Sequence, residues 1–278
     1  MHTGKIPDGM FSIDKKLVGD TEFSVVGYKR LKGSDDLNVA EKVFFANEAN
    51  INLKFIKIDL NDSSIVIEPG ALYFMKGKLS LESNIEGGIV SGLFRKATSG
   101  ETLFQSTISG TGEVFLEPSF GHFLLLDIDD DELIMDDGSF YCCSKGIKVS
   151  GAIQKNISSA LFGGETLVQT STKGTGLVVI NSPVPESELI CYELESGEKL
   201  RVDGNFALIR TASVKFSVEK SGKSLFQSLT SGEGLLQTFE GPGIVWIAPT
   251  QVVYNKIKRA GVNGLANSAK SGNMNNSV

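Results

Sequence analysis

The sequence predicts an all-β protein built from three tandem repeats of short antiparallel strands, which together form a single domain over residues 51–250. Two observations support this prediction. Glycine is frequent, at 31 residues, among many Val, Ile, Leu and Phe, and no long segment carries the apolar stripe of an amphipathic helix. In addition, three short phrases recur in the same order along the chain, and such recurrence indicates a repeat architecture.

The first phrase is a turn around a glycine, the second reads Gly-Glu-(Thr/Gly)-Leu-x-Gln, and the third is Gly-x-Gly before an apolar run. The turn glycines are Gly70, Gly138 and Gly204. The second phrase begins at Gly100-Glu101, Gly164-Glu165 and Gly232-Glu233. The third phrase ends at Gly112, Gly176 and Gly243. Aligning all three phrases places the repeats at about 53–118, 121–182 and 187–250.

Within the repeats, apolar and polar residues alternate with the period of a strand. In the segment 54–60, Ile56, Ile58 and Leu60 share one face, and residues 213–219 alternate in the same way. The uninterrupted apolar run 123–126 is typical of a strand that is buried on both faces. The Gly-x-Gly phrases indicate bulges or tight bends where strands begin.

The two ends of the chain lie outside the repeats. Residues 1–50 form an N-terminal extension, in which 23–31 and 43–45 are expected to add a strand or a short helix. Residues 255–278 are rich in Asn, Ser, Gly and Ala and are predicted to be a disordered tail. The few basic residues of this tail are interpreted as a solvated segment, although a basic segment can also touch RNA or a membrane surface.

Charge and composition exclude several classes of partner. The net charge of −6 and the pI of about 5.1 argue against nucleic-acid binding, which requires clustered Lys and Arg. No apolar stretch is long enough for a transmembrane helix, so no membrane insertion is expected. Three cysteines without framework spacing, and an N-terminus without an apolar signal core, predict a reducing compartment and a cytoplasmic location.

The residues that carry common chemistries are scarce, so we predict no catalytic residues, no cofactor and no metal. The chain has two histidines, of which His122 is the only one placed to be ordered, and this is too few for a cupin-like metal site. Cys142 and Cys143 are adjacent and are interpreted as packing residues rather than zinc ligands. The acidic run 127–132 resembles the start of a calcium loop, but it lacks the required later glycine and glutamate and is interpreted as a polar turn.

The recurrent glutamates Glu101, Glu165 and Glu233 have two interpretations. Symmetry could gather them into a ring of carboxylates, or each could accept backbone hydrogen bonds in its own turn. We favour the structural interpretation for these glutamates and for the repeat-motif glycines.

The order of these phrases, closing on Gly241-Pro242-Gly243 and the apolar run 245–247, resembles the bacterial relatives of the mitochondrial biogenesis protein "altered inheritance of mitochondria 24". The resemblance covers about residues 51–250 and implies a fold similar to the tryptophan RNA-binding attenuation protein (TRAP), a TRAP-like β-sandwich or β-prism. It also implies a homo-oligomer, with a trimer favoured, and a domain of unknown function without established catalytic residues.

The leading hypothesis is therefore a non-enzymatic oligomeric scaffold or interaction protein with an unknown protein partner, because exposed strand edges and apolar patches can be covered by symmetric assembly. One alternative is a small-molecule or RNA-binding module, by analogy of fold alone. A second alternative is an enzyme that acts on sugars with carboxylates only, because two suitably spaced acids suffice for glycoside hydrolysis.

Overall fold

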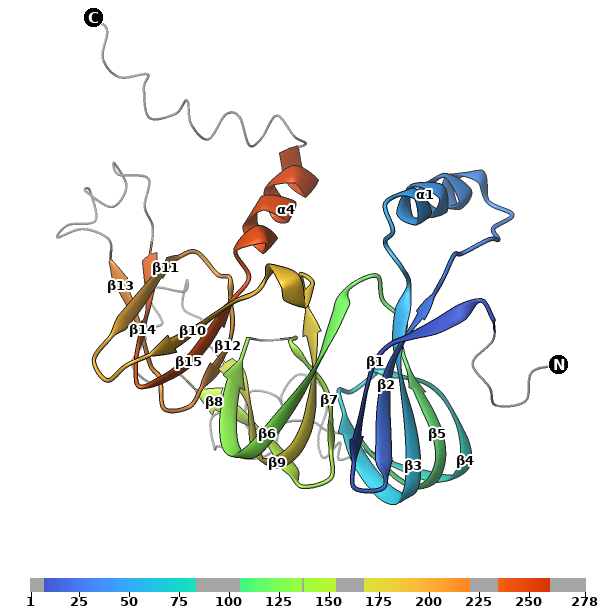
Figure 1. Cartoon of the computed structure of the whole chain (residues 1–278), viewed down its shortest axis with the longest axis horizontal. Coiled ribbons are helices and arrows are strands. Elements are labelled where there is room, and N and C mark those ends of the chain that lie inside the picture. Colours follow the sequence, from blue (N-terminus) through green and yellow to red (C-terminus); the bar gives the residue numbers. More distant parts are fainter. Residues whose placement is uncertain (1–7, 84–105, 137, 154–167, 221–234, 261–278) are drawn as a thin grey trace, which may run out of the picture. The chain divides into compact units, whose positions relative to one another are not determined.

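A computed structural model describes residues 8–83, 106–136, 138–153, 168–220 and 235–260. The described residues are predominantly strand, so the all-β prediction is confirmed (Figure 1). The chain divides into two compact units, residues 1–182 and 183–278. Among the described residues, no helix is both long and apolar enough to cross a membrane.

The N-terminal extension supplies two strands and a helix to the first unit. They are β1 (Met10–Val18), β2 (Thr21–Tyr28) and α1 (Leu37–Glu48). Asp36 caps α1, because its carboxylate accepts hydrogen bonds from the backbone N–H groups of Asn38 and Val39. None of the residues of α1 is buried. Strands β1 and β2 form an antiparallel hairpin, and β2 continues the sheet onto the first repeat strand.

The first predicted repeat forms three long antiparallel strands. They are β3 (Lys54–Ile67), β4 (Leu72–Ser83) and β5 (Ser106–Leu116). Strand β5 lies in the middle and pairs with both β3 and β4. The predicted alternation in the segment 54–60 is observed, since Ile56, Ile58 and Leu60 are buried in the core. Strand β4 pairs with β5 alone, so its other edge has no strand neighbour among the described residues.

The second predicted repeat forms four strands. They are β6 (His122–Met135), β7 (Phe140–Ser144), β8 (Ile147–Ile153) and β9 (Val168–Ser182). Strand β9 lies between β6 on one side and β7 and β8 on the other. Strand β7 also pairs with the end of β3, where Val66 lies opposite Cys143. This pairing joins the two predicted repeats around one core, to which Ile65, Leu125 and Val179 contribute.

A bulge interrupts β3 and β6 at matching places. The register shifts between Leu60 and Ser63, opposite Gly112 and Gly110, and it shifts between Ile128 and Asp131, opposite Gly176 and Gly174. In each bulge an aspartate has positive φ, and its backbone N–H donates a 2.9 Å hydrogen bond to a threonine hydroxyl on the facing strand. The pairs are Asp62 with Thr111 and Asp130 with Thr175. The acidic run 127–132 therefore lies in a bulge within the continuous strand β6, and its interpretation as a polar turn between strands is wrong.

The second unit begins with a short 3-10 helix, continues with shorter strands and ends with an α-helix. Its elements are the 3-10 helix η2 (Glu186–Glu188), the strands β10 (Ile190–Leu194), β11 (Lys199–Asp203), β12 (Ala207–Thr211), β13 (Lys215–Lys220), β14 (Leu235–Glu240) and β15 (Gly243–Ile247), and the helix α4 (Pro249–Ala260). Strand β15 pairs with β10 and β12, and β14 pairs with β11 and β13. In the sheet of β11, β14 and β13, β11 lies at one end.

Helix α4 corrects the prediction that the disordered tail begins at residue 255. Residues 255–260 are the second half of this helix. The helix is anchored near its start, because the hydroxyl groups of Thr250 and Tyr254 donate hydrogen bonds of 2.5 and 2.8 Å to the carboxylate of Glu188. Lys258 and Arg259 lie in its last turn, where positive charge interacts favourably with the helix dipole. The remainder of the predicted tail lies outside the described residues.

Candidate interaction surface

A row of aromatic rings crosses four neighbouring strands of the first unit. Tyr28 of β2 lies 5.9 Å from Phe55 of β3, measured between ring centroids, and Phe55 lies 5.8 Å from Phe115 of β5. Phe115 stacks on Phe74 of β4 at 4.2 Å with an interplanar angle of 17°, and Tyr73 follows at 5.4 Å from Phe74. Aromatic pairs in such offset or tilted arrangements add stabilisation beyond that of the buried area alone. We call these five residues the aromatic row.

Strand alternation places Phe55, Phe74 and Phe115 on the face of the sheet opposite the hydrophobic core. Ile56 and Ile58 point into the core, so Phe55 and Lys57 point to the other face. On β5, Val114 points into the core and Phe115 to the other face, where it lies opposite Phe74. The row therefore lies across the sheet from the main hydrophobic cluster, and its member Phe55 is itself buried.

The row becomes more exposed toward β4. Phe55 has 8% of its surface exposed, whereas Phe74 and Tyr73 at the far end have 50% and 57% exposed. Met75, on the core side of the same strand, has 37% exposed. The backbone of β4 has no strand neighbour on this side among the described residues. We call the segment 73–77 of β4 the open edge, because it combines apolar side chains with an unpaired strand edge.

In strand β7 the edge that corresponds to the open edge of β4 is covered by another strand. Residues Cys142 and Cys143 of β7 are fully buried, and β3 pairs along the edge that corresponds to the open edge. The two thiols are free, and burial raises the pKa of Cys142 and that of Cys143, the latter to about 12. Inert, protonated thiols in this position agree with the predicted packing role.

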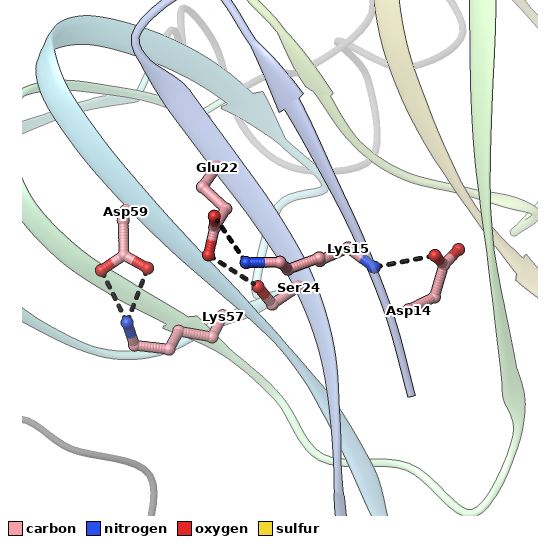
Figure 2. A network of polar contacts seen from close by, with 6 residues as sticks. All are labelled: Asp14, Lys15, Glu22, Ser24, Lys57 and Asp59. Carbon is pink, nitrogen blue, oxygen red and sulfur yellow. Dashed lines mark hydrogen bonds and ion pairs between the residues drawn. The ribbon is translucent and has the colours of Figure 1, made fainter. Parts of the chain in front are cut away.

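Beside the aromatic row lies a strip of charged residues (Figure 2). Lys57 Nζ lies 2.6 Å from both carboxylate oxygens of Asp59 and 3.1 Å from Glu113 Oε1. It also lies 5.9 Å from the centroid of the Phe115 ring, within range of a cation–π contact. Burial lowers the pKa of Lys57, but the hydrogen bonds and charges of the two acids outweigh it, so the net pKa is raised.

The strip continues onto the N-terminal hairpin. Lys15 Nζ lies 3.2 Å from Glu22 Oε2, and the Ser24 hydroxyl donates a 3.5 Å hydrogen bond to Glu22 Oε1. Figure 2 shows both contacts. The backbone N–H of Lys15 donates to Asp14. Burial, together with the charge of Tyr73, raises the pKa of Tyr28, so this phenol stays neutral at physiological pH. The surface thus offers an apolar platform bordered by paired charges, which suits binding rather than proton transfer.

The structure places the repeat-motif glycines at turns and strand crossings. Gly70, Gly138 and Gly204 have positive φ in the turns that follow β3, β6 and β11. The later glycines Gly112, Gly176 and Gly243 also have positive φ. A Cβ would overlap the backbone of β4 at Gly112, the Ser144 side chain at Gly176 and the Thr211 side chain at Gly243. The glycines and glutamates of the second phrase fall outside the described residues, although residues 168–169 and 235–237 of the phrase lie in β9 and β14. These glycines and glutamates are Gly100, Glu101, Gly164, Glu165, Gly232 and Glu233.

The described part of the chain holds no group of three or more His, Cys, Asp or Glu side chains that could bind a metal ion. His122 lies at the start of β6, opposite Ser182. Asp127 of the acidic run instead forms an ion pair with Lys16 of β1. Sequence reasoning missed the aromatic row, because its five residues come from four different strands.

Comparison with known proteins gives a family but no activity. The sequence profile described as "Mitochondrial biogenesis AIM24" matches residues 25–250. An uncharacterised protein of Streptococcus pyogenes serotype M6 is 26% identical over 226 residues, which cover 75% of this chain and 86% of that protein. A crystal structure of a Streptococcus pyogenes protein is similar with a TM-score of 0.55 and 21% identity, and the match covers 74% of this chain and 94% of that one. This structural likeness concerns the fold alone.

Proposed function

This chain is a member of the mitochondrial biogenesis AIM24 family, and from that premise we propose that it acts as a non-enzymatic, oligomeric scaffold or interaction protein. The observation that carries the proposal is the aromatic row, which ends in half-exposed rings at the open edge of β4. Large exposed apolar residues beside an unpaired strand are typical of surfaces that another chain covers.

The apolar area exposed at the open edge sets the free energy that its burial could contribute to association. Tyr73, Phe74 and Met75 expose between 37% and 57% of their surface. With about 200 Å² for each large side chain, they leave about 300 Å² in water. Burial of that area contributes about 7 kcal/mol before the costs of association. Association costs about 4–15 kcal/mol, so this area contributes to binding but must be part of a larger interface.

The finer architecture belongs to the same proposal. We propose three tandem TRAP-like repeats, a view supported by the paired bulges of β3 and β6 and by a third pairing, Leu194 with Gly243, that matches Leu60 with Gly112. We favour a trimer with a further protein partner. The free thiol state of all three cysteines supports a cytoplasmic location, because the reduced form is the one that persists there.

Native mass spectrometry of the purified protein tests the proposal. We expect a defined multiple of 29.8 kDa without added mass. The variant Phe74→Ala removes the exposed ring that stacks on Phe115, and it should shift the distribution toward the monomer. Leu17→Ala is the matched control, because Leu17 is 70% exposed on β1, away from the open edge, and this change should leave the distribution unaltered. A wild-type protein that is monomeric at micromolar concentration would refute the proposal.

A further inference from the structure

Strand β4 lacks the neighbour that its counterpart β7 has. We infer that the open edge of β4 pairs with the free edge of β11 from a second copy of this chain, in a head-to-tail contact. The inference rests on the proposed oligomeric function and names the two strands that would form the contact. Both edges are without a strand neighbour among the residues that the structure describes.

The correspondence between β4 and β7 comes from their registers against the neighbouring strand. On β5, Val114 faces Met75, and on β9, Val178 faces Cys143. Each valine lies two residues after the corresponding Gly-x-Gly phrase, and Phe74 and Cys142 then correspond as well. The side chain that is half exposed in β4 is thus fully buried in β7. Cys142 packs in the hydrophobic core, and the edge of β7 is paired with β3, whereas β4 has no such neighbour among the described residues.

The end of β3, which pairs with β7, shows the length and the kind of strand that could pair with β4. The end of β3 pairs through Ile65, Val66 and Ile67. Backbone hydrogen bonds of 3.1 Å from Lys145 to Ser64 and of 2.9 Å from Glu68 to Tyr141 extend this pairing to five residues.

Strand β11 matches the end of β3. Leu200 of β11 faces Phe239, as Ile65 of β3 faces Ile108. Phe239, Ile65 and Ile108 are buried, and Leu200 is half-buried. Strand β11 spans five residues, Lys199–Asp203, which is the length of the pairing observed between β3 and β7.

If β11 pairs with β4 in the register in which β3 pairs with β7, the opposing residues are defined. Leu200 of one copy would lie opposite Lys76 of the next, Arg201 opposite Met75, and Val202 opposite Phe74. In β7, Ser144 corresponds to Lys76 and lies opposite Ile65. The backbone hydrogen bond from Lys145 to Ser64 joins the residues that flank this pair, so Ser144 and Ile65 are not hydrogen-bonded to each other. The Leu200–Lys76 pair is therefore a non-hydrogen-bonded pair, in which the Cα atoms lie about 4.5 Å apart.

The contact would be confined to the edge of the sheet. In the second predicted repeat, Leu125 and Leu177 continue the apolar face into the core, whereas the first repeat has Lys57 and Glu113 at the same places. This ion pair keeps the centre of the face polar, so only the outer end of the aromatic row would be covered. A head-to-tail contact of this kind closes a ring when the rotation between copies allows it, and otherwise it continues as a filament.

Cysteine cross-linking tests the contact. Two proteins are prepared in a Cys191→Ser background, which removes the one exposed native thiol. One carries Lys76→Cys and the other carries Leu200→Cys. Under mild oxidation, the mixture should give a disulfide-linked dimer on non-reducing electrophoresis, while each protein alone should not, because the predicted Cα separation suits a disulfide. Ser80→Cys mixed with Leu200→Cys is the register control and should not cross-link. Far-UV circular dichroism verifies that every variant is folded.

Each outcome decides between the contact and its competitors. Cross-linking of either protein alone would show a two-fold symmetric contact and would overturn the inference. A chain that carries both cysteines and closes only an internal disulfide would place the contact within one molecule and would also overturn it. An oligomer in native mass spectrometry without the mixed disulfide would refute this interface and leave the proposed function intact. A strictly monomeric wild-type protein would remove both.

Discussion

Gly110 offers a direct test of how closely β4 and β5 approach each other at the bulge. Its φ is +126°, and a Cβ at this position would overlap the backbone carbonyl oxygen of Lys78. Gly70 has a φ of +85°, but a Cβ there would meet nothing within 4 Å. Both Gly110→Ala and Gly70→Ala therefore incur the conformational cost of positive φ, about 1–2 kcal/mol. Only Gly110→Ala also forces two backbones apart.

The additional cost can be estimated from the pairing. Separation of β4 from β5 at this crossing would weaken about two ladder hydrogen bonds, each worth about 1 kcal/mol. We expect Gly110→Ala to destabilise the protein by about 3–4 kcal/mol and Gly70→Ala by about 1–2 kcal/mol. Urea denaturation followed by far-UV circular dichroism measures both, and a difference of about 2 kcal/mol corresponds to a midpoint shift of about 1 M between the variants. Equal destabilisation by the two substitutions would refute the close approach.

Two further predictions concern the buried thiols and the charged strip. In the native protein at pH 8, a thiol reagent should modify Cys191 alone, because burial raises the pKa of Cys142 and Cys143. In denaturant, all three thiols should react. Rapid labelling of more than one thiol in the native protein would contradict the packing of β7. Lys57→Met should destabilise the protein by about 1–3 kcal/mol at pH 7, measured by urea denaturation, because it leaves two carboxylates without their cation. The pKa of Lys57 is raised above its ordinary 10.5, so its contribution is present below pH 10.5 and is lost as the pH rises through the folded-state pKa. The stability gap between wild type and Lys57→Met should therefore narrow in strongly alkaline solution, and a gap that does not depend on pH would argue against the ion pairs.

The strands were predictable because their signals are local. Alternation in β3 reflects burial of one face, and the turn glycines mark conformations that other residues rarely adopt. Helix α4 was missed because it is short, largely polar and anchored by Glu188, a residue far away in the sequence. Composition alone gives such a segment no signal that separates it from a disordered tail.

The aromatic row could not be predicted because it depends on register. Phe55, Phe74 and Phe115 come from three strands, and each is an ordinary strand residue in its own segment. They meet because β5 lies between β3 and β4 and because Phe74 faces Phe115 in the ladder. A single shift of one residue in either pairing would send one of the rings to the opposite face. Side chains that gather across strands are therefore determined by the tertiary structure, even where every strand is recognised.

The hairpin of β1 and β2 has a practical consequence for work on fragments. Strand β2 covers the first half of β3, from Lys54 to Leu60, and it contributes the buried side chains of Phe23, Val25 and Val26. The region shared with the family begins at residue 25, inside this strand. A fragment trimmed to that region would lose β1, half of β2 and the buried side chain of Phe23, so part of the backbone edge and apolar face of β3 would become exposed, which favours aggregation. The N-terminal segment is thus a protective cover, and expression of shortened forms should begin before Met10.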